Sequence, residues 1–227
     1  MRKWKIAMAA LLTSFATVPA TAEMVLSQVI FDLHPGKPPR EDVEVFNTSG
    51  ERMYVAADAF EIVHPGTEAE VRLPADRPDL AGILVSPKRL ILAPGERRTI
   101  RIAMLGPRSA KDRVYRVAIK PVVGAVTSDK NALSVFVGYD TLVIVRPEIL
   151  EDKITYKREG QTLSITNEGN TSQEFFEGRQ CDAVGKVCAE LPAKRLYAGA
   201  TWTQELPLQS KATYKTAIAE VVKQMEF

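Results

Sequence analysis

Short segments of alternating apolar and polar residues recur along nearly the whole chain, and their spacing of about ten residues limits the fold more than any other feature. Most end at glycine, proline or asparagine turns; they cover residues 25–36, 41–66, 82–105 and 112–123. This spacing is typical of an antiparallel β-sandwich. Only residues 213–225 suggest a helical period, and we interpret them as strand. The sequence therefore predicts an all-β protein.

The first 22 residues differ from the rest of the chain. They have a basic start, an apolar centre and the ending Ala20-Thr21-Ala22. This pattern predicts a secretory signal peptide that is cleaved after Ala22. A membrane anchor is the alternative, but the apolar run is short for a bilayer. Without the leader's three basic residues, the 30 Lys and Arg of the chain fall one short of its 28 Asp and Glu. The charge therefore gives no reason to expect nucleic acid or membrane insertion.

The part after the leader, about 205 residues, fits one large domain or two of about 100. Pro147 interrupts the last strand of the first part, and a charged stretch follows it. We predict one domain over residues 23–148 and a second over 149–227. The second is small for an independent core.

Two cysteines lie in the second part, at Cys181 and Cys188. In an exported chain they favour a disulfide that closes a short loop. A redox or metal pair is the alternative, but the spacing is not that of a C-x-x-C motif.

The chain offers little for catalysis. His34 and His64 each precede a Pro-Gly turn, so we interpret them as turn residues rather than as a metal pair. Asn47 and Asn170 match the glycosylation pattern but also stand in expected turns. No motif of a nucleophilic, zinc or phosphate site is present. We expect a protein that is not an enzyme and has no cofactor or metal.

One long stretch, residues 131–147, is apolar on both faces of an expected strand. Its apolar members include Leu133, Val135, Phe136, Val137, Tyr139, Leu142 and Ile144. Such a strand is an aggregation hazard unless something covers it. Either it pairs with a partner by strand addition, or sheet packing and interdomain packing bury its two faces. The periodicity leaves both explanations open.

Several motifs between residues 25 and 150 resemble a known family. They are Ser86-Pro87, Leu90, Leu92, Pro94-Gly95, Ile100-Arg101-Ile102, Asp112-Arg113 and Tyr115. Together they resemble the first domain of the PapD-like periplasmic chaperones of the chaperone–usher pathway. The segments 163–170, 181–188 and 197–202 look like the alternate branch that serves CFA/I-type and common-pilus systems.

This resemblance implies two immunoglobulin-like β-sandwich domains in a boomerang arrangement. It implies a periplasmic chaperone that lends a strand to an incomplete pilus or fimbrial subunit, which it then delivers to an outer-membrane usher. By position, the donated side chains are those of Leu133, Val135, Val137 and Tyr139. Phe136, Leu142 and Ile144 would face the protein's own core. The free chaperone could also hide its strand by self-association.

One departure concerns the subunit's terminal carboxylate, which the best-known branch holds with two basic residues. Here Gln28 and Leu142 stand at those positions, and neither is cationic. We consider Arg116, Lys120 and Arg146 as substitutes. An exported pilus or adhesin component remains the alternative function. It is disfavoured because the first strand begins at about Val25, directly after the expected cleavage site.

Overall fold

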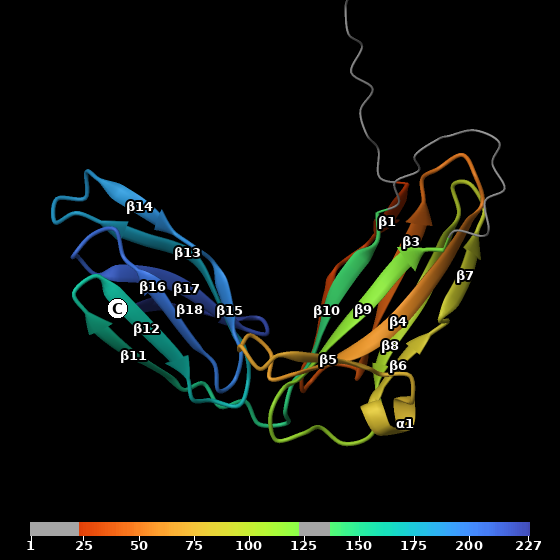
Figure 1. The fold of residues 1–227 in the computed structure, drawn as a ribbon, viewed down its shortest axis with the longest axis horizontal. Coiled ribbons are helices and arrows are strands. Elements are labelled where there is room, and N and C mark those ends of the chain that lie inside the picture. Colours follow the sequence, from red (N-terminus) through yellow and green to blue (C-terminus); the bar gives the residue numbers. More distant parts are fainter. Residues whose placement is uncertain (1–22, 123–136) are drawn as a thin grey trace, which may run out of the picture.

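The computed structural model describes residues 23–122 and 137–227, and these form two β-sandwiches. Figure 1 shows the sandwiches set at an angle, so that the chain has the shape of a wide V. The strands up to Val145 build one sandwich, and those from Ile154 onward build the other. The predicted all-β fold is therefore confirmed; the single helix, α1 (Pro78–Ala81), has four residues.

The first sandwich packs a four-stranded sheet against a six-stranded sheet. The four-stranded sheet has the order β1 (Met24–Leu26), β3 (Arg40–Asn47), β8 (Arg97–Met104) and β6 (Ile83–Ser86). The six-stranded sheet has the order β2 (Ile30–Leu33), β10 (Tyr139–Val145), β9 (Arg113–Pro121), β4 (Met53–Val63) and β5 (Val71–Pro74), while β7 (Arg89–Leu92) also pairs with β4. Alternate residues of both sheets fill the core between them.

The second sandwich is smaller, and an aromatic cluster holds it together. One sheet has the order β11 (Ile154–Glu159), β12 (Thr162–Asn167) and β16 (Thr201–Glu205). The other has the order β14 (Cys188–Leu191), β13 (Gln173–Cys181), β17 (Ala212–Ile218) and β18 (Val221–Glu226), while β15 (Lys194–Leu196) also pairs with β13. Phe175, Trp202, Tyr214 and Phe227 meet mostly edge to face between the sheets. Residues 213–225 lie in β17, β18 and their turn, so the strand interpretation is confirmed.

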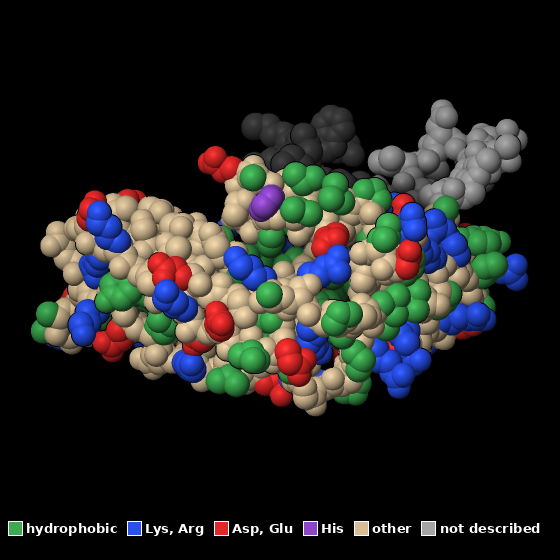
Figure 2. Space-filling model, turned by 90° about the horizontal axis from the view of Figure 1, so that it is seen from below, with side chains coloured by type: hydrophobic (Ala, Val, Ile, Leu, Met, Phe, Trp, Pro, Cys, Tyr) green, Lys and Arg blue, Asp and Glu red, His purple; other side chains and the backbone are tan. Residues whose placement is uncertain are grey.

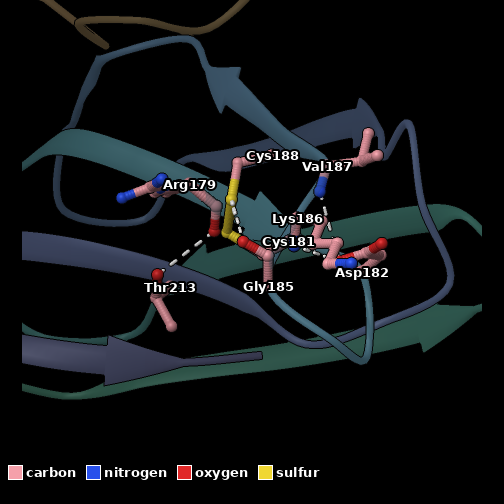
Figure 3. Close-up of a disulfide and its surroundings, with 8 residues drawn as sticks. All are labelled: Arg179, Cys181, Asp182, Gly185, Lys186, Val187, Cys188 and Thr213. Atoms are coloured by element: carbon pink, nitrogen blue, oxygen red, sulfur yellow. Dashed lines mark hydrogen bonds between the residues drawn. A yellow bond between two sulfur atoms is a disulfide. The ribbon is translucent and has the colours of Figure 1, made fainter.

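The predicted disulfide between Cys181 and Cys188 is present (Figure 3). It joins directly opposed residues of β13 and β14. The loop between them is further ordered by Asp182, whose carboxylate accepts the backbone N–H groups of Lys186 and Val187.

The two asparagines of the glycosylation pattern are structural. Asn47 is fully buried, and its Nδ2 group donates to the carbonyl oxygens of Glu51, Leu92 and Ala93. Asn170 donates to the carbonyl oxygen of Ile149. Their amides therefore tie turns to neighbouring segments.

The surface and the polar clusters agree with the modest chemistry of the sequence. Figure 2 shows acidic and basic side chains side by side over most of the face seen from below the V. Across the described residues, His, Cys, Asp and Glu side chains form no group of three placed to hold a metal ion. Within the same residues, no helix is both long and apolar enough to cross a membrane.

Candidate functional site

Strand β10 lies at the side of the first domain that is turned toward the second domain (Figure 1). Its odd-numbered side chains, Val143 and Val145, join the core of the first sandwich. Its even-numbered side chains, Leu142 and Ile144, form a separate buried cluster against which Tyr197 of the second domain packs. Over Tyr139–Val145, both faces of the strand are thus covered, one by the sandwich and one by the domain interface.

The expectation that Leu142 and Ile144 face the sandwich core was wrong. The side chains of a strand alternate, and the core takes the odd positions here. Tyr139 belongs to the same set: it packs against the core, and its hydroxyl donates to the Met24 carbonyl oxygen at 2.9 Å. Its side chain is therefore directed into the protein itself.

The first three residues of β10 have a strand neighbour on one side. β9 pairs with β10 along Tyr139–Val145, whereas β2 pairs with it only along Leu142–Val145. The Leu142 N–H donates to the Val29 carbonyl oxygen on the β2 side. Since backbone groups alternate along a strand, the N–H and C=O of Asp140 face the same side. There, no strand among the described residues pairs with Tyr139–Thr141, which we call the open edge.

Exposed apolar side chains surround the open edge. Val29 and Ile30 on the neighbouring segment are about half exposed, and Val137, two residues before β10, is 53% exposed. Val137 and Gly138 precede the strand rather than extend it. The predicted donor residues Leu133 and Val135, with Phe136, lie outside the described residues.

A cluster of charges covers the sheet face that carries Leu142 and Ile144, which we call the junction face. Arg72 holds the Asp140 carboxylate with two hydrogen bonds of 2.7 and 3.1 Å and stacks on the Phe60 ring. Arg116 is a more distant partner, with its Nε 3.9 Å from Asp140 Oδ2. Its Nη1 also donates to the Asp140 carbonyl oxygen at 3.2 Å, so its guanidinium reaches the open edge.

A second cluster on the same face has the same composition. Arg89 Nη1 donates to Asp58 Oδ1 at 2.9 Å, and Lys120 Nζ lies 3.7 Å from Asp58 Oδ2. Each aspartate therefore has one close cation and one looser cation. Both looser cations, Arg116 and Lys120, come from β9.

The two non-basic positions are occupied by structural side chains. The Gln28 amide donates to Glu41 Oε2 at 2.9 Å, and Leu142 is buried in the interface cluster. Neither offers a cation to a carboxylate.

Arg146 does not serve as an accessible anchor either, because its side chain is only 1% exposed. Its guanidinium makes two bonds to the Asp32 carboxylate, at 2.7 and 2.8 Å. Its Nη1 donates to Thr171 Oγ1 and to the Ser172 carbonyl oxygen of the second domain. Arg146 thus joins the two domains, and its donors are already used.

Asp112 completes this buried junction from the loop between β8 and β9. Its Oδ2 accepts the Ser172 N–H at 2.6 Å, and its own N–H donates to the Asn170 carbonyl oxygen at 2.9 Å. Burial raises the pKa of the Asp112 carboxyl above its ordinary value, and the Ser172 N–H and the Arg146 charge only partly offset this rise. The ionised form is therefore the unfavourable one in the folded protein.

This raised pKa predicts how Asp112→Asn changes the pH dependence of stability. The penalty for ionised Asp112 is present above its raised folded pKa and disappears below the unfolded value of about 3.9. Between pH 7 and pH 4, the wild type should gain free energy of unfolding relative to the variant. Urea unfolding of both proteins across this range measures the difference. A difference that does not change with pH would contradict the assignment.

The comparisons with known proteins agree with this architecture. EcpE, a probable fimbrial chaperone of Escherichia coli K12, is 28% identical over 150 residues, which cover 61% of this chain and 58% of EcpE. A CFA/I fimbrial protein of Escherichia coli is 29% identical over 160 residues, 66% of this chain and 65% of that protein. The chain thus spans about three fifths of the length of these curated relatives. No protein family model matches it.

Among solved structures, the class 5 fimbriae chaperone CfaA is similar with a TM-score of 0.66 and 22% identity, covering 89% of this chain and 98% of CfaA. A chain of the CsuC–CsuE chaperone–tip adhesion subunit complex of Acinetobacter baumannii gives 0.63 at 13% identity, covering 90% and 98%. The protein thus has the fold of the fimbrial chaperones, with two immunoglobulin-like domains. The resemblance to the PapD-like chaperones, on the CFA/I- or common-pilus-type branch, is confirmed. None of these similar proteins is named as an enzyme, in line with the prediction.

The motifs did not indicate several residues of the site. Asp140 carries a signal in retrospect, because it is a lone acid at the start of an apolar strand. Arg72 and Asp58 lie in segments with other charges, and nothing in the sequence relates them to β10. Asp32, the partner of Arg146, is 114 residues away from it in the chain.

Proposed function

We propose that this protein is a periplasmic chaperone that binds and stabilises pilus or fimbrial subunits by strand addition and delivers them to an outer-membrane usher. The observation that carries the proposal is the open edge of β10. It offers unpaired backbone groups at Asp140 next to the exposed apolar side chains of Val29, Ile30 and Val137. An added strand would satisfy these groups and cover this surface.

Two further observations support this function. Similar structures include a chaperone–tip adhesin complex of CFA/I fimbriae and a complex of the SafA pilin with the SafB chaperone. In addition, the buried contacts of Arg146 and Asp112 tie the two domains together beside β10. A fixed domain angle would present the open edge to the partner in one geometry, which lowers the entropic cost of binding.

Of the three cations considered as anchors for a terminal carboxylate, two remain in the proposal. The side chains of Arg116 and Lys120 are about one third and one half exposed, and each has only a loose contact with an aspartate. They can therefore turn toward a bound subunit.

Replacing both Val135 and Val137 with aspartate tests the donated strand. Each valine buried in a subunit groove would contribute roughly 1.5–3 kcal/mol, so the double variant should lower the yield of soluble subunit severalfold. The measurement is co-expression with the small secreted subunits encoded beside this gene, followed by co-purification. Val184→Asp, in the exposed disulfide loop of the second domain, is the control and should leave the yield unchanged. If the double variant and the control retain equal amounts of the subunit, the donor assignment is wrong.

A further inference from the structure

The junction face carries more positive than negative charge, and the surplus lies on one strand. Arg72 satisfies the Asp140 carboxylate through two hydrogen bonds, and Arg89 lies close to Asp58. The second cation of each cluster is left at a longer distance, 3.9 Å for Arg116 and 3.7 Å for Lys120. Each cluster of one acid and two bases therefore has one cation that can take another carboxylate.

Both surplus cations can reach the open edge. Arg116 and Lys120 are four residues apart on β9, so they are spaced by roughly 13 Å along the strand and share one face. Arg116 already crosses β10, because its Nη1 bonds to the Asp140 carbonyl oxygen that faces the open edge.

Gly138 gives Lys120 its access. A Cβ atom built on Gly138 would lie 2.9 Å from the Lys120 Cβ, so the two residues are immediate neighbours. Since glycine has no side chain, nothing from residue 138 stands between Lys120 and a strand placed along the open edge.

We propose that the junction face of β9 and β10 is a receptor for acidic side chains of the partner strand, with Arg116 and Lys120 binding two carboxylates about four residues apart. In a strand added beside β10, alternate side chains lie on the junction face. The partner is therefore an extended segment with acidic residues on one face and apolar residues on the other. This inference rests on the proposed strand addition at the open edge.

Three synthetic nonapeptides test the receptor by NMR titration of the labelled protein. All have valine at alternate positions. The first has glutamate between the valines and blocked ends, the second has glutamine there and blocked ends, and the third is the glutamine peptide with a free terminal carboxylate. The backbone amides of Tyr139–Thr141 report binding. We expect the glutamate peptide to bind about tenfold more tightly than the blocked glutamine peptide at low salt, and this preference to shrink at 0.3 M salt.

The double variant Arg116→Gln/Lys120→Gln should remove this preference. Its control, Arg97→Gln/Lys157→Gln, loses the same charge at two exposed ion pairs elsewhere and should keep it. Equal binding of the two blocked peptides, or a preference that survives in the double variant, would overturn the receptor but leave strand addition intact. A preference shown only by the free-carboxylate peptide would replace side-chain recognition with recognition of a chain end. If no peptide shifts the amides of the open edge, strand addition itself fails.

Discussion

Replacing Arg146 with methionine is expected to lower the free energy of unfolding by about 3–5 kcal/mol. Arg146 is fully buried, and its guanidinium serves Asp32 in the first domain and Thr171 and Ser172 in the second. Methionine fills part of the same volume but offers no donor. It would leave the Asp32 carboxylate without its partner and Asp112 without a nearby positive charge.

Urea unfolding of the variant measures this loss, and Arg101→Met is the matched control. Arg101 makes a two-bond pair with Asp42 of the same kind, but that pair lies in solvent on the four-stranded sheet. Exposed pairs contribute little to stability, so the control should unfold close to the wild type. Similar unfolding midpoints for both variants would mean that Arg146 does not act as a buried link between the domains.

The contrast between these two arginines shows what the sequence could predict and what it could not. The spacing of strands and turns was enough to predict β-sandwiches, because alternation and turn residues are local properties. Arg146 looked like an accessible cation, because its burial depends on Asp32, Thr171 and Ser172. These residues are distant in sequence and belong to both domains.

Strand β10 illustrates the same limit. Its apolar character on both faces was evident, and burial by sheet and interdomain packing was one of the two explanations considered. Which face meets which neighbour depends on register and on Tyr197, which reaches Leu142 and Ile144 only through the placement of the second domain. Alternation alone cannot make that assignment.

The charges of the junction face were only half visible. Arg116 and Lys120 could be named because they lie on the strand before β10. That they are the loosely held members of two clusters depends on Arg72 and Arg89. Those two residues come from β5 and β7, beyond β4 in the sheet, so only the pairing order of the strands brings them near Asp140 and Asp58.

Asp140→Pro should abolish the recovery of soluble partner subunit, whereas Asp140→Ala should largely preserve it. The Asp140 N–H faces the open edge rather than β9, so proline removes no bond of the sheet, and prolines are tolerated at such edge positions. The proline ring takes away the donor that an added strand would use and places carbon atoms in the path of its carbonyl group.

The alanine variant separates this main-chain effect from the loss of the carboxylate. Both substitutions release Arg72 and Arg116 from Asp140, so any effect of the freed cations is common to the two proteins. Co-purification from the periplasm compares the recovered subunit, and thermal unfolding shows whether both variants stay folded. If the proline variant is folded and equals the alanine variant in the amount of subunit recovered, the partner does not pair with this edge. Strand addition would then have to occur elsewhere on the molecule, because a proline at residue 140 cannot accommodate a strand hydrogen-bonded to the N–H that it has lost.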